Sequence, residues 1–323
     1  MSGDYRPLAT EQKNMGLAMR NGAPAIRGGK TALGARVSGA LALLAAMAAS
    51  GKAVAQQGLG QPVPGGLAFQ ESASPVMDFI QWFHNWLLLP IITIISIFVA
   101  GLLLWCMYRY SERRNPKPST TTHHVGLEVA WTVIPVLILI IIAIPSFRLL
   151  YQQQVIPRAD MTIKATGSSW RWSYDYPDHG NFNFVSTMQT DAERQQRIQS
   201  GTPASEVPRL LAVDNEVVVP INKVIRVQVT SSDVLHAFAV PSFGVKIDAV
   251  PGRLNETWFR ATREGIYFGQ CSELCGKDHA FMPIAVRVVS EQAFAAWVAD
   301  AKRRFASTER PTTVAANDIP AAR

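Results

Sequence analysis

The stretch from Cys271 to Met282 holds the densest group of metal-binding side chains in the sequence. Its two thiols, Cys271 and Cys275, lie four residues apart, and an imidazole and a thioether, His279 and Met282, follow closely. Thiolate and thioether sulfur are soft ligands that favour copper, and imidazole also binds copper well. The spacing therefore predicts a copper site on a loop, completed by a second imidazole from elsewhere in the chain.

The second imidazole is expected from His236, which we place at the end of a predicted strand. A mononuclear copper site of this type needs one cysteine, and this loop has two. Two thiolates on one loop can bridge two metal ions, each capped by one histidine. Met282 would then bind one ion and the backbone carbonyl of Glu273 the other. Such a pair shares one electron with little change in geometry, which favours fast electron transfer.

Three other interpretations compete for the same residues. A Cys271–Cys275 disulfide would leave both histidines and Met282 without a role. A tetrahedral zinc site would use the two thiols and two imidazoles but not the methionine. Covalent haem attachment requires Cys-x-x-Cys-His, and here three residues separate the cysteines and Gly276 follows the second, so haem attachment is excluded.

Two apolar segments ahead of this loop predict a membrane hairpin over residues 78–151. The first segment covers roughly 78–109 and the second about 128–150, and each is long enough to cross about 30 Å of hydrocarbon. The intervening loop, 109–124, carries four Lys/Arg against one Glu. By the positive-inside rule this loop is cytoplasmic and the rest of the chain lies outside.

From residue 160 the sequence changes to short alternating runs separated by turn residues, which predicts an all-β sandwich or barrel over 158–306. An amphipathic helix is expected at 290–306, and residues 188–206 read as an inserted polar segment. The predicted strands are Thr162–Ala165, Glu216–Val219, Val224–Thr230, Thr257–Arg260 and Ala285–Val289.

The ends of the chain differ in character from its centre. A short apolar run preceded by basic residues and followed by Ala53-Val54-Ala55 predicts a secretory signal over residues 1–55, with a mitochondrial transit peptide as the alternative. Residues 56–77 read as a flexible lead-in and 307–323 as a disordered tail.

The formal net charge of +7 belongs mainly to the ends and the inter-helix loop. Residues 1–60 carry seven Lys/Arg against two Asp/Glu, whereas residues 159–300 carry 13 against 16. The β-domain is therefore mildly acidic. It favours a basic protein partner and excludes nucleic acid as a partner.

Three motifs resemble subunit II of the cytochrome c oxidases, and with the two apolar segments the likeness covers roughly residues 75–300. The motifs are Asp233–Pro241, Lys246–Asn255 and Gly269–Ile284. The resemblance implies a cupredoxin-like domain that carries the dinuclear copper centre called CuA. Its implied ligands are His236, Cys271, the Glu273 carbonyl, Cys275, His279 and Met282.

The resemblance also implies roles for three further groups. Trp170 resembles the tryptophan through which the family receives electrons, although a core aromatic is the alternative from the residue alone. Glu128 aligns with the glutamate at the mouth of a proton-uptake channel, although a solvated helix cap is the alternative. The side chain of Glu273 would bind a magnesium ion shared with the catalytic subunit.

Two departures from the family pattern fall where a cytochrome would dock. The family usually has Gly-His-Gln before its tryptophan, and this chain has Gly167-Ser168-Ser169. The family usually has an aromatic residue between two tryptophans, and this chain has Arg171. A positive charge there would weaken the attraction for a basic cytochrome.

The implied function is the electron-input subunit of a respiratory oxidase, which takes electrons from cytochrome c and passes them to a haem-bearing subunit for oxygen reduction coupled to proton translocation. No haem is expected in this chain. Subunit I, subunit III and membrane lipid are the expected partners, in a bacterial inner membrane with the copper domain and both mature termini in the periplasm. The candidate docking carboxylates, around the copper loop, are Asp175, Asp178, Asp214 and Asp233, with scattered solvated carboxylates as the alternative.

Two other kinds of function fit parts of the same sequence. The same copper module could serve a nitric oxide reductase, whereas a nitrous oxide reductase would need a large catalytic domain in the same chain. A membrane-anchored binding or assembly protein with an incidental metal site is the non-redox alternative. The intact ligand set argues against it, because quinol-oxidising relatives of the family lack the thiol and imidazole ligands.

Overall fold

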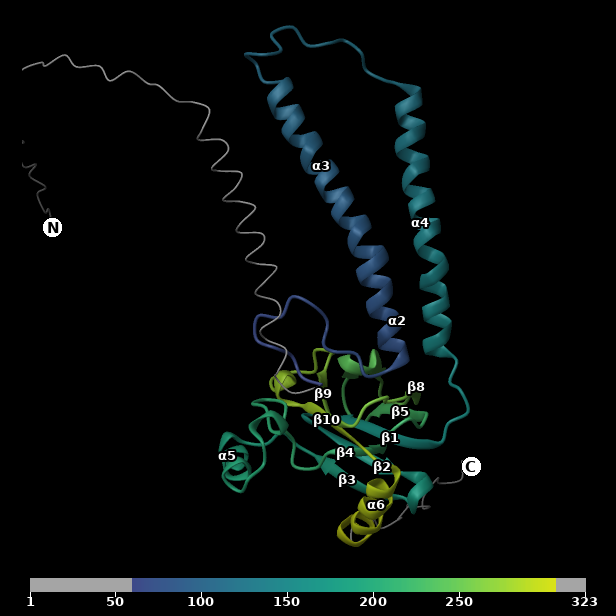
Figure 1. The fold of residues 1–323 in the computed structure, drawn as a ribbon, viewed down its shortest axis with the longest axis vertical. Helices are drawn as coiled ribbons and strands as arrows, with labels where there is room; N and C mark the ends of the chain where they lie inside the picture. The colour runs from purple at the N-terminus through teal and green to yellow at the C-terminus, as the bar shows by residue number, and fades with distance from the viewer. Residues whose placement is uncertain (1–59, 306–323) are drawn as a thin grey trace, which may run out of the picture. The chain divides into compact units, whose positions relative to one another are not determined.

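The computed structural model of the chain describes residues 60–305 (Figure 1). The expected signal over residues 1–55 and the expected tail over 307–323 lie outside the described residues. Within the described part, a pair of long apolar helices precedes an all-β sandwich, as the sequence predicts.

The first long helical segment runs from Pro75 to Arg109 and consists of α2 (Pro75–Phe83), a π-helical turn η1 (His84–Leu88) and α3 (Leu89–Arg109). The second is α4 (Val125–Gln154). The most apolar 18-residue stretches of the two have mean hydropathies of 2.8 and 2.7, so both are long and apolar enough to cross a membrane. Each predicted span is therefore present and a few residues longer than expected.

The N-terminus of α2 is fixed by its own sequence. Ser74 is the N-cap, its hydroxyl accepts a hydrogen bond from the backbone N–H of Met77, and Pro75 occupies the first helical position. A hydroxyl cap satisfies one of the free N–H groups at a helix start, and proline fits there because its missing N–H would be unpaired. The helix therefore begins within the predicted lead-in.

The described part of the predicted flexible lead-in, residues 60–74, is bonded to the sandwich. The backbone N–H of Ala73 donates to the carbonyl of Ser242 at 2.9 Å. The buried Ser74 hydroxyl donates to the carbonyl of Phe243 at 2.7 Å. A Gly/Pro/Gln-rich composition predicts flexibility, but it does not reveal hydrogen-bond partners that lie far away in the sequence.

The sandwich consists of two five-stranded sheets, with strand orders β3-β2-β1-β5-β8 and β4-β10-β9-β6-β7. Neighbouring strands are antiparallel except for the parallel pairs β1–β5 and β4–β10. The strands are β1 (Met161–Ser168), β2 (Arg171–Tyr176), β3 (Phe182–Ser186), β4 (Val217–Pro220), β5 (Ile225–Ser231), β6 (His236–Val240), β7 (Val245–Ala249), β8 (Asn255–Phe259), β9 (Gly265–Cys271) and β10 (Pro283–Val289).

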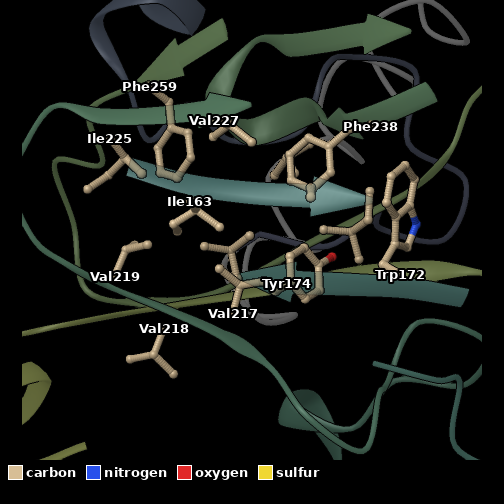
Figure 2. Close-up of a cluster of buried hydrophobic side chains, with 14 of the residues drawn as sticks. Ile163, Trp172, Tyr174, Val217, Val218, Val219, Ile225, Val227, Phe238 and Phe259 are labelled. Atoms are coloured by element: carbon tan, nitrogen blue, oxygen red, sulfur yellow. The ribbon is translucent and has the colours of Figure 1, made fainter. Parts of the chain in front are cut away.

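The core lies between the two sheets. Strands β1 and β5 alternate strictly between buried and partly exposed residues, which places Ile163 and Val227 on the inner face. Phe238 of the second sheet belongs to the same buried cluster (Figure 2). Burying an apolar side chain of this size contributes about 1.5–3 kcal/mol to folding, so this cluster holds the sheets together.

Helices cover the ends and edges of the sandwich. The inserted segment 188–206 contains α5 (Asp191–Gln199), which begins with a reciprocal capping box between Thr190 and Glu193. The predicted terminal helix is α6 (Glu291–Phe305), which buries Phe294 and Val298. Short 3-10 turns occur at η2 (Pro177–His179), η3 (Ala204–Glu206), η4 (Pro241–Phe243) and η5 (His279–Phe281).

Candidate metal centre

Two adjacent strands of the second sheet bring the candidate ligands together. Cys271 is the last residue of β9, and His236 is the first residue of β6. The sequence placed His236 at the end of a strand, whereas it opens one. Because β6 and β9 are antiparallel neighbours, the start of one and the end of the other meet at the same edge of the sheet. The loop from Ser272 to Met282 then folds over this edge.

All six predicted donor groups converge at this edge. The Sγ atoms of Cys271 and Cys275 are 3.8 Å apart. Each thiol has its own imidazole, because Cys271 Sγ lies 3.9 Å from His236 Nδ1 and Cys275 Sγ lies 3.4 Å from His279 Nδ1. Met282 Sδ is 3.6 Å from Cys275 Sγ, and the Glu273 carbonyl oxygen is 3.3 Å from Cys271 Sγ.

The thiols are free and spaced to share a metal. A disulfide requires sulfurs about 2.05 Å apart, so Cys271 and Cys275 are not bonded to each other. Two sulfurs bound to one ion at about 2.3 Å each, with a tetrahedral angle between them, lie about 3.8 Å apart. The observed separation fits that requirement.

The positions of the imidazoles favour two ions over one tetrahedral zinc. Within residues 60–305, the ligand atoms of His236, Cys271 and Cys275 lie within 4.8 Å of one another, and this cluster does not include His279. His279 instead contacts Cys275. Soft sulfur from Met282 adds a donor that a Cys2His2 zinc site does not use. The donor set therefore fits a thiolate-bridged copper pair.

The pocket around these donors is largely closed to water. His236 and Met282 are 0% and 1% exposed. Burial, with a smaller effect of the adjacent Cys271 sulfur, raises the pKa of the Cys275 thiol to about 12. Deprotonating the Cys275 thiol at neutral pH is therefore favoured by a nearby cation, as expected of a thiol that binds metal as it loses its proton.

His236 is held by a carboxylate that the sequence assigned to docking. Its Nε2 lies 2.9 Å from Asp233 Oδ1, which leaves Nδ1 directed at Cys271. Burial alone would raise the pKa of Asp233, but hydrogen bonds from His236 and from the Ser169 backbone N–H hold that pKa well below its usual range. A carboxylate on the far nitrogen fixes the orientation of a metal-binding imidazole.

Gly167, in the penultimate position of β1, leaves room for the same ring. A Cβ atom at this position would lie 2.9 Å from Cδ2 of His236, closer than real Cβ contacts allow. The role of Gly167 was missed from the sequence, because only the folded chain brings residue 167 against residue 236.

Trp170 packs directly on the candidate metal-binding loop. Its indole Nε1 donates a hydrogen bond to the carbonyl of Cys275 at 3.1 Å. A Cβ on Gly276 would lie 3.2 Å from Cζ2 of the indole, so only glycine allows this packing easily. The side chain is partly exposed, whereas Trp172, two residues later, is fully buried and meets the His236 ring edge-on at 6.2 Å.

The predicted metal and proton roles of two glutamates remain predictions. The Glu273 side chain is exposed, and its carboxylate is not in the ligand cluster found within residues 60–305. Glu128 Oε1 accepts a hydrogen bond from the His124 backbone N–H at 3.0 Å, while His124 Nδ1 accepts one from the Leu127 backbone N–H. His124 is thus the N-cap of α4 and the Glu128 carboxylate bonds back to it, and both roles that the sequence left open for Glu128 stay predictions.

The four candidate docking carboxylates do not all lie beside the loop, and their docking role stays a prediction. Asp178 accepts a hydrogen bond from the Thr162 backbone N–H, at the opposite end of β1 from Gly167 and so roughly 17 Å away. Asp175 faces the same far half of β1. Strand β2 runs away from the loop, so the acidic residues on and after this strand lie far from the loop. Asp214 caps the backbone after edge strand β3, and Asp233 alone contacts the site.

The departure at Arg171 lies beside the loop. Arg171 pairs with Ser168 across the β1–β2 turn that contains Trp170. Its side chain is exposed and makes no ion pair with any residue in 60–305. A free positive charge therefore stands next to the indole.

Comparison with known proteins gives consistent matches over most of the chain. Residues 161–289 match the profile of the cytochrome C oxidase subunit II periplasmic domain, and residues 62–149 match that of the subunit II transmembrane domain. Cytochrome c oxidase subunit 2 of Cereibacter sphaeroides is 48% identical over 283 residues, covering 84% of this chain and 92% of that protein.

Two further matches come from Rickettsia bellii and Bradyrhizobium japonicum. The probable cytochrome c oxidase subunit 2 of R. bellii is 48% identical over 257 residues, covering 80% of this chain and 91% of that protein. The solved periplasmic domain of subunit II of the B. japonicum cytochrome oxidase is 62% identical. It covers 47% of this chain and 99% of that chain, with a TM-score of 0.41.

Proposed function

Because the chain belongs to the cytochrome c oxidase subunit II family, we propose that it is the electron-input subunit of a respiratory oxidase. In this role it accepts electrons from cytochrome c at a dinuclear copper centre and passes them to the haem-bearing catalytic subunit. The observation that carries the proposal is a pair of thiols 3.8 Å apart, each in contact with its own imidazole. The relatives reported above are oxidase subunits, which favours an oxidase over a nitric oxide reductase.

The residues that would hold copper are those that converge at the β6–β9 edge. Bound copper would supply one-electron redox chemistry at this site. The protein would contribute a rigid ligand set, because two of the ligand residues lie on strands β6 and β9 and the others lie on the loop that folds over the ends of these strands. The proposed ligands are His236, Cys271, the Glu273 carbonyl, Cys275, His279 and Met282.

Two neighbouring side chains would support this site in different ways. Asp233 would keep the His236 ring oriented with Nδ1 toward the thiols. The indole of Trp170 would connect a docked cytochrome to the loop, because its N–H is bonded to the carbonyl of the ligand residue Cys275. Each electron would leave a ferrous haem of the donor, which becomes ferric, and would pass through this contact.

The remaining assignments follow from family membership and are part of the proposal. The subunit would be anchored by the two apolar helices in a bacterial inner membrane, with the β-domain in the periplasm and subunits I and III as partners. Glu273 would contribute to a magnesium site completed by the catalytic subunit. Glu128 would lie at the mouth of a proton-uptake route, and residues 1–55 would be a removed signal.

The test is metal content together with low-temperature EPR on the full-length chain, purified in detergent and reconstituted with copper. We expect two copper ions per chain and one unpaired electron delocalised over both. Cys275→Ser should abolish this signal. Cys106→Ser is the matched control, because Cys106 is a free, exposed thiol in α3. One zinc per chain, or a metal-free Cys271–Cys275 disulfide, would overturn the proposal.

A further inference from the structure

A pocket lies between α2 and α4, at the end of the hairpin that adjoins the β-domain. Its volume is about 460 Å³. The nearby end of α4 is tied to the domain, because the carbonyl of Gln152 accepts a hydrogen bond from the indole of Trp258 at 3.1 Å. The lining residues are Phe79 and Trp82 of α2, and Ile144, Pro145, Arg148 and Gln152 of α4.

The aromatic residues of α4 place this pocket at the level of lipid head groups. Trp131 and Tyr151 are exposed and twenty residues apart, which is roughly 30 Å along a helix and about the thickness of the hydrocarbon layer. Such residues mark the two membrane–water interfaces. Arg148 lies one turn before Tyr151, so its guanidinium reaches the boundary between hydrocarbon and head groups.

Arg148 carries a charge that the described residues do not balance. It and Glu128, at the other end of the helix, are the only charged residues of α4. Arg148 makes no ion pair with any residue in 60–305, and the exposed Asp78 of α2 is not bonded to it. Its guanidinium lies 5.8 Å from the centre of the Phe79 ring. An arginine at this depth is costly unless an anion accompanies it.

The pocket is polar at one end and apolar at the other. Arg148, the indole N–H of Trp82 and the side-chain amide of Gln152 are donors that line it, and none has a hydrogen-bond partner within the described part of the chain. Ile144 and Pro145 give it an apolar side. An arginine fork binds phosphate through two parallel hydrogen bonds.

We infer that this pocket binds the phosphate of an anionic phospholipid. A lipid fits both of its ends, because the phosphate meets the donors while the acyl chains lie along the apolar side of Ile144 and the exposed helix surfaces. A carboxylate from a neighbouring protein subunit would satisfy the charge of Arg148 but would leave the apolar side unexplained. The lipid would then help to fix the helix pair beneath the β-domain.

The test is retention of phosphatidylglycerol by the full-length chain, measured by native mass spectrometry after exchange from vesicles of phosphatidylglycerol and phosphatidylcholine. Removing one charge-assisted phosphate contact, by Arg148→Gln, should lower retention roughly tenfold. Arg148→Lys should give intermediate retention, because the charge is preserved but the two parallel hydrogen bonds of the guanidinium fork are lost. The matched control is Arg158→Gln, which removes an exposed charge just beyond α4 and should retain phosphatidylglycerol as the unmodified chain does.

Two outcomes would overturn the inference. The first is equal retention of phosphatidylglycerol by Arg148→Gln and Arg158→Gln. If Arg148→Gln, purified from its native membrane, also loses the haem-bearing subunit, the occupant is a protein carboxylate. The second is displacement of the lipid by inorganic phosphate alone, which would indicate a simple anion site. Circular dichroism of each variant separates these outcomes from misfolding.

Discussion

The indole Nε1 of Trp170 donates a hydrogen bond to the backbone carbonyl of Cys275, with the two atoms 3.1 Å apart. This contact connects a partly exposed aromatic side chain to a residue of the candidate copper loop through one hydrogen bond. A cytochrome docked on the exposed edge of the indole would therefore be separated from the thiol pair by a single side chain.

Replacing Trp170 with phenylalanine removes the indole N–H and keeps an aromatic ring. We expect copper content to be unchanged and electron transfer from reduced cytochrome c to fall by roughly tenfold or more, since about 1.4 kcal/mol in a barrier is tenfold in rate. Stopped-flow absorbance of the cytochrome measures this rate. Trp297→Phe is the control, because Trp297 packs on Tyr176, away from the loop. An unchanged rate in Trp170→Phe would remove the indole from the route.

Replacing Asp233 with asparagine should weaken copper binding. The carboxylate holds Nε2 of His236 at 2.9 Å, and loss of such a partner typically lowers metal affinity by about 10–100-fold. Competition with a copper chelator measures the affinity. Asp214→Asn provides the control, because Asp214 caps the backbone of Thr187 and does not contact the site. Equal losses in both variants would assign the effect to general destabilisation.

Replacing Gly167 with alanine should displace the His236 ring. The added Cβ would lie 2.9 Å from Cδ2 of the imidazole, so either the ring or strand β1 must move. We expect the delocalised copper EPR signal to be lost or split into mononuclear signals. Gly101→Ala in α3 is the matched control, since nothing lies within 4 Å of a Cβ there. An unaltered signal in Gly167→Ala would show that the loop accommodates the shift.

Burial of His179 should make stability depend on pH. Desolvation lowers the pKa of His179, and Asp178 only partly offsets it. In the unfolded chain the ring binds a proton near pH 6.5, so as pH falls below that value the unfolded state gains the proton before the folded state does. The contribution of His179 to stability is therefore present above about pH 6.5 and lost as pH falls through its lowered folded pKa.

The measurement for His179 is urea unfolding at about pH 7.5 and about pH 5, with the histidine pKa followed by NMR. His179→Phe keeps a ring against Phe294, which the imidazole meets edge-on at 5.1 Å. We expect this variant to lose less stability between the two pH values than the unmodified chain. The same loss in both proteins would contradict the assignment.

The candidate site could be predicted from the sequence because its chemistry is concentrated locally. Five of the six donor residues lie within Cys271–Met282, and the structure brings all six groups together. The supporting residues could not be predicted in the same way. Gly167 acts on His236 only through the packing of β1 against β6, and Asp233 looked like a surface carboxylate until the ring was placed beside it.

Alternation of burial accounts for only part of the strand prediction. Strands β1 and β5 alternate between buried and partly exposed residues, and both were expected. Strands β6 and β9 are buried on both faces over most of their length, so no alternation marks them. Strands β4 and β10 are buried in the same way but were expected from their valine-rich runs, whereas β2 and β3 alternate and were not predicted. Residues 60–74 were expected to be flexible because of their composition. The sequence could not reveal their hydrogen-bond partners, such as Ser242, because these lie far along the chain.

Arg171 should set how salt affects the reaction with cytochrome c. The guanidinium is exposed, unpaired within residues 60–305 and adjacent to Trp170. It should repel a basic cytochrome, so Arg171→Tyr should raise the second-order rate constant several-fold at low ionic strength. The difference in rate constant between Arg171→Tyr and the unmodified chain should disappear near 1 M salt, where the Debye length is about 3 Å.

The control for Arg171 is Arg260→Tyr, which removes the same charge at a position away from the loop. Arg260 follows the last residue of β8, and this end of β8 pairs with the start of β5. If both variants raise the rate alike, the net charge of the domain governs association. If Arg171→Tyr alone raises it, the residue beside the indole governs the approach of the donor. If Arg171→Tyr lowers it, the natural donor presents an acidic surface at this point, and the arginine attracts its partner.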